Sequence, residues 1–86
     1  MKLLQFKAEW CNPCKLQTKE FESNKLNVEL NAINVDDDPD DLTNQYKVRS
    51  IPTMVLINDN GEEINRWSNF TKVSTINEFI DSYDKE

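Results

Sequence analysis

The two cysteines of the chain, Cys11 and Cys14, are the residues with the most chemistry to offer. They stand two residues apart in the stretch AEWCNPCK (8–15), with Trp10 in front of them and Pro13 between them. Two cysteines are too few for the disulfide framework of a small secreted domain, and a ring over two intervening residues restricts the unfolded chain little. A purely structural disulfide is therefore a weak interpretation.

A metal site is the second possible use of these cysteines. Structural zinc sites take four ligands, usually Cys and His, and the sequence holds two Cys and no His. A monomer would have to recruit carboxylates to complete such a site, whereas a dimer could share four thiolates. An iron–sulfur cluster meets the same shortage. The aspartate-rich run at 36–41 lacks the spacing, loop glycine and final Glu of an EF-hand. We therefore expect no bound metal.

A redox centre fits the position of the cysteines best. They follow a short apolar run at 2–7 and open a segment with weak helical periodicity. Residues three apart in a first helical turn lie close enough to form a disulfide, and a helix N-terminus stabilises a thiolate. We expect an exposed Cys11 of lowered pKa to attack and a less accessible Cys14 to resolve the mixed disulfide. Pro13 suits the helix start and stiffens the ring.

Four predicted strands must position this pair. Apolar runs indicate them at 2–7, 27–35, 53–57 and 62–68. In the second strand we expect Val28, Leu30 and Ala32 to face inward, with Ile33 and Val35 as weaker candidates.

A hairpin and a helix are predicted from turn and capping residues. Asn60-Gly61 is typical of a type I′ hairpin between the last two strands. Asp38 can cap a helix that has Pro39 in its first position and runs to about residue 47.

Two further helices are predicted from periodicity. One follows the cysteines, and the other is the last element, starting at a Thr75–Glu78 capping box or nearer Thr71. The face expected to be buried in the last helix comprises Val73, Ile76, Phe79, Ile80 and Tyr83.

The order β-α-β-α-β-β-α describes a single α/β domain over residues 1–86. Its first βαβ unit should be a right-handed parallel crossover and its last two strands an antiparallel hairpin. A four-stranded mixed sheet flanked by three helices uses all of these elements.

Composition excludes several classes of function. The formal net charge is −6 and the basic residues are scattered, which argues against a nucleic-acid surface. No apolar run approaches the length of a membrane span, and the start MKLLQFK is too short for a signal-peptide core. We expect a cytoplasmic monomer.

The segment AEWCNPCK resembles the active-site segment of the thioredoxin family, normally W-C-G-P-C-K. VRSIPT (48–53) resembles the family's I-P-T segment, which carries a cis-proline, and the likeness covers about residues 3–83. It implies a thioredoxin-like fold and a protein dithiol–disulfide oxidoreductase with a reversible Cys11–Cys14 disulfide and no bound cofactor. Its partners would be target proteins with disulfides and a flavin-dependent, NADPH-using thioredoxin reductase.

The resemblance also implies roles for single residues. Cys11 matches the nucleophile, Cys14 the resolving cysteine, and Pro52 the cis-proline opposite the disulfide. Ile51 matches the residue whose backbone pairs with the substrate chain, and Trp10 matches the aromatic residue that shapes the contact surface.

The sequence departs from the family pattern around the cysteines. Asn12 replaces the usual Gly and should shift the reduction potential. Gln5 and Ala32 stand where the family has a buried Asp and a Lys, so the usual proton acceptor for the resolving thiol is missing. We expect water or Glu9 to take that proton, or the step to be slower.

Two further departures from the family pattern, and two charged residues beside the cysteines, complete the predicted site. Asn69 replaces a glycine in the loop before the last helix and should narrow or re-aim the substrate groove. Lys15 favours the thiolate slightly, whereas Glu9 disfavours it. The family's usual first strand and helix have no counterpart, which makes the chain nearer in size to a glutaredoxin.

Two alternatives stay open at this point. A glutathione-coupled, glutaredoxin-like role fits the size, but the single glycine of the chain leaves no Gly-Gly turn. A redox-independent binding module would instead use an apolar patch of Trp10, Ile51, Pro52 and Phe70.

Overall fold

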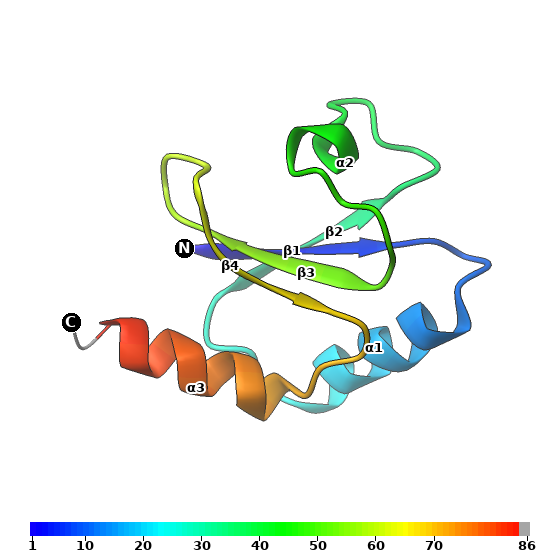
Figure 1. The fold of residues 1–86 in the computed structure, drawn as a ribbon. Coiled ribbons are helices and arrows are strands. Elements are labelled where there is room, and N and C mark those ends of the chain that lie inside the picture. The colour runs from blue at the N-terminus through cyan, green and yellow to red at the C-terminus, as the bar shows by residue number, and fades with distance from the viewer. Residues whose placement is uncertain (85–86) are drawn as a thin grey trace.

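The computed structural model of the chain describes residues 1–84 and places seven elements in the predicted order (Figure 1). Their bounds are β1 (Lys2–Lys7), α1 (Asn12–Ser23), β2 (Glu29–Asn34), α2 (Leu42–Gln45), β3 (Thr53–Ile57), β4 (Glu63–Ser68) and α3 (Val73–Asp84). The predicted α/β class and four-stranded mixed sheet are confirmed.

The sheet has the strand order β2-β1-β3-β4. β1 runs parallel to β2 and antiparallel to β3, and β4 pairs antiparallel with β3. The helices α1 and α3 cover one face of the sheet and α2 covers the other (Figure 1). All five residues of the inner strand β3 are buried, as expected of a strand covered on both faces.

The core divides into two apolar layers, one on each face of the sheet. The layer under α1 and α3 contains Leu3, Met54, Leu56, Ile76 and Ile80. The layer under α2 contains Leu4, Phe6, Ile33, Val55 and Ile57. Successive residues of a strand point to opposite faces, so β1 and β3 contribute to both layers.

The predicted inward face of β2 is wrong at Leu30 and Ala32, whereas Val28 and Val35 are half-buried against the core as expected. Leu30 and Ala32 pair in register with Leu3 and Gln5, yet both are exposed, whereas Ile33 is buried on the other face. The reason is the position of β2 at the edge of the sheet, where the helices cover the strand incompletely. A pattern of apolar residues does not reveal which strand lies outermost.

The predicted length of α2 is also wrong. This helix has four residues and begins at Leu42, so Pro39 is not its first residue. Asp38 still caps it, because its carboxylate accepts hydrogen bonds from the backbone N–H groups of Leu42 at 3.1 Å and Thr43 at 2.8 Å. Asp41 holds a left-handed backbone conformation just before the helix, which keeps the preceding loop out of it.

The turn between β3 and β4 also differs from the prediction. Only Gly61 has a positive φ in the hairpin, and its N–H donates to the Asn58 carbonyl at 3.0 Å, so the turn is not type I′. Helix α3 begins at Val73, so Thr75 lies inside the helix and does not start it with a capping box, and the alternative start nearer Thr71 is correct to within two residues.

The predicted buried face of α3 holds except at its end. Val73, Ile76 and Ile80 are buried, while Phe79 is half-buried and Tyr83 is 43% exposed. The ring of Tyr83 stacks on Phe79 at a centroid distance of 6.1 Å instead of entering the core. Across residues 1–84, the structure contains no helix with the length and apolar character needed to cross a membrane.

Candidate active site

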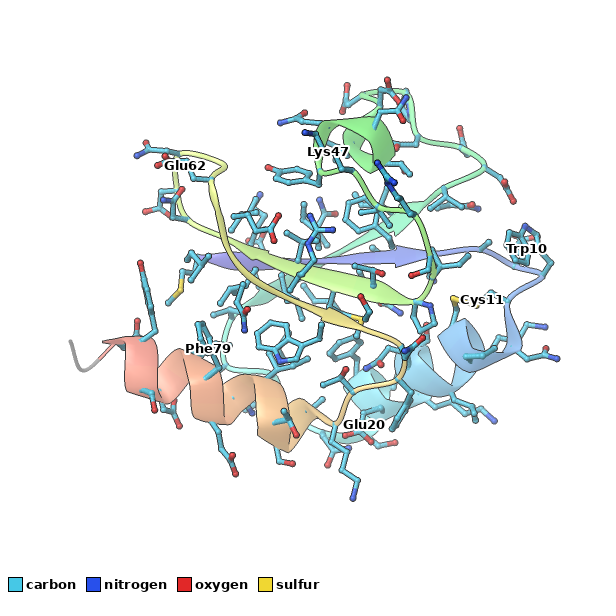
Figure 2. All side chains as sticks on the ribbon, in the orientation of Figure 1. Trp10, Cys11, Glu20, Lys47, Glu62 and Phe79 are labelled. Atoms are coloured by element: carbon cyan, nitrogen blue, oxygen red, sulfur yellow. A yellow bond between two sulfur atoms is a disulfide. The ribbon has the colours of Figure 1, made fainter. Side chains whose placement is uncertain are left out.

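Cys11 and Cys14 are joined by a disulfide at the N-terminus of α1, as expected (Figure 2). Their Cα atoms are 5.2 Å apart. Cys11 is the N-cap residue, with an extended backbone, and its Sγ accepts a hydrogen bond from the Cys14 N–H at 3.2 Å. Pro13 lies in the first turn, where its missing N–H leaves no helical hydrogen bond unmade. The N–H group of Cys14 thus points at the sulfur that the sequence identified as the attacking one.

The expectation of an exposed Cys11 is wrong for the disulfide state. Cys11 is 5% exposed and Cys14 is 1% exposed, and both pack with Ala8. The half-buried side chain of Ile51 lies against this group. The difference between the two cysteines has the expected sign but is small, because residues from the strand ends cover both sulfurs.

The segment just before β3 lies beside the disulfide although it is remote from the cysteines in the sequence. The Ile51–Pro52 peptide bond is cis, and Pro52 is buried. The Thr53 hydroxyl donates to the Ser50 carbonyl at 2.7 Å, which closes the turn around the proline. The structure therefore packs Ile51 against the cysteine pair and places Pro52 directly after it in the chain.

Asn69 lies in the loop between β4 and α3 and has a φ of 69°. Asn tolerates this left-handed conformation better than most residues with a side chain. The Asn69 N–H donates to the Pro52 carbonyl at 2.8 Å, which anchors the loop beside the cis peptide. The substitution of the family's glycine by Asn thus leaves the turn intact.

Trp10 projects from the edge of the molecule next to Cys11 (Figure 2) and is 68% exposed. Its Nε1–H donates to the carboxylate of Asp36 at 2.7 Å, which fixes the direction of the ring. Trp10 and Ile51 line a hollow of about 340 Å³ together with Val35, Thr43, Val48, Arg49 and Ser50. The site therefore has an exposed aromatic side chain beside a partly apolar hollow.

Gln5 lies in β1 beneath α1 and is 2% exposed. Its Nε2 donates to the Thr18 hydroxyl at 3.1 Å, so the amide is satisfied without any titratable partner. Ala32, its neighbour on β2, is exposed and carries no charge. Neither residue can accept a proton from Cys14.

A second hollow, of about 800 Å³, borders Cys14. Its lining includes Glu9 and Lys15, the two charged residues that the sequence singled out beside the cysteines, and also Thr18 and Lys7. A carboxylate and ammonium groups therefore share one water-accessible space with the resolving cysteine. Asn12, the other residue expected to tune the pair, is exposed in the first turn of α1.

The sequence interpretation missed Gln17, Glu20 and Thr71. Gln17 is fully buried on α1 and pairs with the backbone of Thr71, and Glu20 accepts a hydrogen bond from the Val73 N–H at 2.8 Å. The available signal was a polar residue three positions after Cys14, on the helix face that should be apolar. Its partner lies 54 residues away in the sequence, so no local pattern identifies it.

The distribution of His, Cys, Asp and Glu side chains bears on metal binding. Within the part that the structure describes, no three His, Cys, Asp or Glu residues lie close enough together to hold an ion. The aspartates at 36–41 instead cap α2 and hold Trp10.

Comparison with known proteins shows which protein family shares this sequence and geometry. The thioredoxin family model matches residues 1–82. The thioredoxin of Chlamydia caviae is 43% identical over 67 residues, which cover 74% of this chain and 64% of that protein. The thioredoxin of Mycoplasma pneumoniae is 35% identical over 81 residues, which cover 91% of this chain and 78% of that protein.

The fold agrees with solved structures as well. The structure of a mutant thioredoxin from Halobacterium salinarum superposes with a TM-score of 0.81 at 30% identity, covering 95% of this chain and 73% of that one. The family match covers almost the whole chain. It agrees with the cysteine pair at the start of α1, with the Ile51–Pro52 segment beside it and with the order of the strands. The chain belongs to the thioredoxin family.

Proposed function

We propose that this protein is a dithiol–disulfide oxidoreductase that reduces disulfides in target proteins. The observation that carries the proposal is the Cys11–Cys14 disulfide at the N-terminus of α1, with the Cys14 N–H directed at the Cys11 sulfur. When the disulfide is reduced, the same N–H and the positive end of the helix stabilise negative charge on that sulfur. Cys11 is therefore the nucleophile and Cys14 the resolving residue.

The exchange proceeds in two displacements. The Cys11 thiolate attacks one sulfur of the target disulfide, the target S–S bond breaks, and its other sulfur leaves as a thiolate that takes up a proton. The Cys14 thiol then loses its proton and attacks the Cys11 sulfur, which releases the second target thiolate and restores the Cys11–Cys14 bond. Two electrons pass to the target, and the disulfide itself is the redox centre.

Target proteins would bind where Trp10, Ile51 and Asn69 surround the disulfide. Ile51 offers its backbone beside the cis peptide, and Trp10 offers exposed aromatic surface. A flavin-dependent reductase that uses NADPH would return the chain to the dithiol form. We place the reaction in the cytoplasm, where a reducing environment keeps the cysteine pair in its dithiol form. We expect the chain to act as a monomer.

The proton on Cys14 needs an acceptor other than Gln5. Glu9 lines the hollow beside Cys14, as does Glu22, and either Glu9 or solvent entering the hollow can take the proton. Substitution Gln5→Asp places a carboxylate in the family's usual position, and we expect it to accelerate the attack of Cys14 and to change its pH dependence. Stopped-flow decay of a mixed disulfide would measure this, and an unchanged rate at every pH would show that position 5 does not limit the step.

The first test of the function is the reduction potential of the cysteine pair together with reduction of insulin. We expect a value near that of thioredoxin, about −270 mV, and not near the roughly −120 mV of a strong oxidant. Cys11→Ser should abolish insulin reduction, whereas Cys14→Ser should accumulate a mixed disulfide. A potential close to the second value would indicate an oxidase or isomerase instead.

Binding without redox chemistry is a second candidate, favoured by the exposure of Trp10 (68%) and Phe70 (44%). The variant with both cysteines replaced by Ser separates the two functions. A binding module keeps its partner and its cellular role in that variant, while an electron donor loses the role.

A further inference from the structure

Gln17 is a buried polar residue that the exchange chemistry does not use. It lies on α1 three residues after Cys14, and it is fully buried. Its Nε2 donates to the Thr71 carbonyl at 2.8 Å, and its Oε1 accepts from the Thr71 N–H at 2.8 Å. Both ends of one side-chain amide are therefore paired with both backbone groups of one residue.

Thr71 belongs to the loop that carries Asn69. The Thr71 hydroxyl donates to the Asn69 carbonyl at 3.1 Å, and the Asn69 N–H donates to the Pro52 carbonyl at 2.8 Å. A continuous series of hydrogen bonds thus runs from Gln17 on the cysteine-bearing helix, through the loop, to the carbonyl of the cis-proline Pro52. The series begins three residues after Cys14, passes through Asn69 and ends next to Ile51.

A second side chain of α1 holds the same loop where it enters α3. The carboxylate of Glu20 accepts a hydrogen bond from the Val73 N–H at 2.8 Å, and Figure 2 shows Glu20 on α1 at the start of α3. Gln17 and Glu20 are three residues apart, so they project from one side of the helix. Because Gln17 and Glu20 hold the α3 side of the loop and Pro52 holds the other side, the loop cannot shift without losing partly buried hydrogen bonds.

Stability alone is a poor reason for an amide at this position. A hydrogen-bonded buried amide contributes little net stability relative to an apolar residue of the same shape. A fully paired polar group does, however, select one arrangement, because any other arrangement leaves buried groups unpaired. Gln17 is therefore suited to fixing a geometry.

We propose that Gln17 is a positioning residue for the exchange reaction. It sets the spacing between the disulfide on α1 and the Asn69 loop, and so controls how tightly an extended segment of a target protein binds. The inference rests on the proposed function, because the spacing matters only if a target segment lies across the loop.

The first test compares Gln17→Leu with the parent chain in the reduction of insulin. Leu has a similar size but pairs with neither backbone group of Thr71. We expect the KM for insulin to rise on the order of tenfold with kcat little changed, because the chemistry at the sulfurs is untouched. Reduction of a small aromatic disulfide, which does not reach the loop, should keep its rate. Ile80→Val, a core substitution in α3 that is 2% exposed, is the control for general destabilisation.

The second test uses Gln17→Glu as a conservative variant whose pairing depends on pH. A protonated carboxyl offers one acceptor and one O–H donor and can replace both hydrogen bonds, whereas a carboxylate can only accept. Burial raises the pKa of a carboxyl at this position. We expect the KM of this variant, divided by that of the parent at the same pH, to be near one at about pH 5 and to reach the level of Gln17→Leu at about pH 8. The ratio removes the pH dependence of the thiols themselves.

These outcomes separate the inference from the function on which it rests. If the parent reduces insulin and a folded Gln17→Leu variant has the parent KM, the positioning role is wrong. If Gln17→Leu does not fold, Gln17→Glu decides the question, and a KM ratio that stays constant with pH overturns the role. Failure of the parent chain to reduce any disulfide would instead refute the proposed function.

Discussion

The two faces of the sheet are covered by helices of very different length, and these helices are held in place by different interactions. The face under α1 and α3 is covered by two helices of 12 residues each, whose apolar sides meet Leu3, Met54 and Leu56. The face under α2 is covered by a helix of four residues and by the loops around it. That face has an apolar layer of its own, but α2 contributes no buried residue to it, so charged and polar groups are needed to hold α2 in place.

The polar contacts of the α2 face form a connected set. Asp38 caps α2, the Tyr46 hydroxyl donates to the Gly61 carbonyl at 2.6 Å, and Arg66 donates to the Tyr46 carbonyl while pairing with Glu63. A short helix buries too little apolar surface to stay in place by packing alone. We therefore expect substitutions of buried apolar residues to lower the free energy of unfolding most on the α1 and α3 face. Changes of pH and salt concentration should act mainly on the α2 face.

The largest effect is expected from Ile76→Ala on the α3 side. Ile76 is fully buried, and removing its side chain beyond Cβ leaves a cavity that should lower the free energy of unfolding by about 3 kcal/mol. Urea unfolding measures this loss. The control is Leu42→Ala on the α2 face, where the side chain is half-buried and the loss should be about 1 kcal/mol. Equal losses would break the distinction between the faces.

A smaller effect is expected when the cap of α2 is removed. Asp38→Ala deletes the acceptor for two backbone N–H groups and for the Thr43 hydroxyl, which lies at 2.6 Å. The free energy of unfolding should fall by about 1 kcal/mol. Substitution of the exposed Asp40 in the same loop is the matched control and should have little effect. If the two variants were equally stable, the cap would not hold α2.

The pH dependence of stability should be traceable to this face. Hydrogen bonds from Thr43, the hydroxyl first, hold the pKa of Asp38 below its ordinary value of 3.8. A lowered pKa in the folded state means that the stabilisation is complete above the unfolded value and is lost as the pH falls through the folded one. Asp38→Asn should therefore flatten the decline of stability between about pH 5 and pH 2, because Asn does not titrate. The change should be smaller than the loss caused by Asp38→Ala, since the Asn side chain can still accept hydrogen bonds as a cap. Parallel profiles for the two proteins would contradict this assignment.

The smallest effect is expected from the ion pair of the hairpin. Hydrogen bonds from Arg66 lower the pKa of Glu63, and the two side chains are about one-third exposed, at 33% and 35%. Glu63→Gln should cost about 0.5 kcal/mol at low ionic strength. The cost should shrink in about 1 M salt, where the Debye length is about 3 Å. Urea unfolding at both salt concentrations provides the measurement, and a cost independent of salt would remove the electrostatic explanation.

Prediction succeeded at the cysteines because the evidence there is local. Cys11, Pro13 and Cys14 lie within one helical turn, so their spacing already places the two sulfurs together at a helix start. The Ile51–Pro52 segment was identified by its resemblance to a family, and no periodicity would have indicated its cis bond. The order of strands and helices followed from apolar runs and turn residues.

Prediction failed where burial depends on neighbours that are remote in sequence. Leu30 and Ala32 looked inward-facing but lie on an edge strand, and Cys11 looked exposed but is covered by residues from other strand ends. The shortness of α2 depends on the left-handed backbone of Asp41, which capping rules placed inside the helix. In each case the local sequence indicated a preference of the residue itself but not which distant segments would pack around it.

The order of the elements, the cysteine pair at a strand-to-helix junction and the acidic cap of α2 were all contained in the sequence, because each depends on residues within a few positions of one another. The burial of both sulfurs, the edge position of β2 and the pairing of Gln17 with Thr71 arose only when distant segments packed together. The physical reason is that burial and hydrogen-bond partners are properties of a neighbourhood. Folding assembles that neighbourhood from residues as far as 54 positions apart.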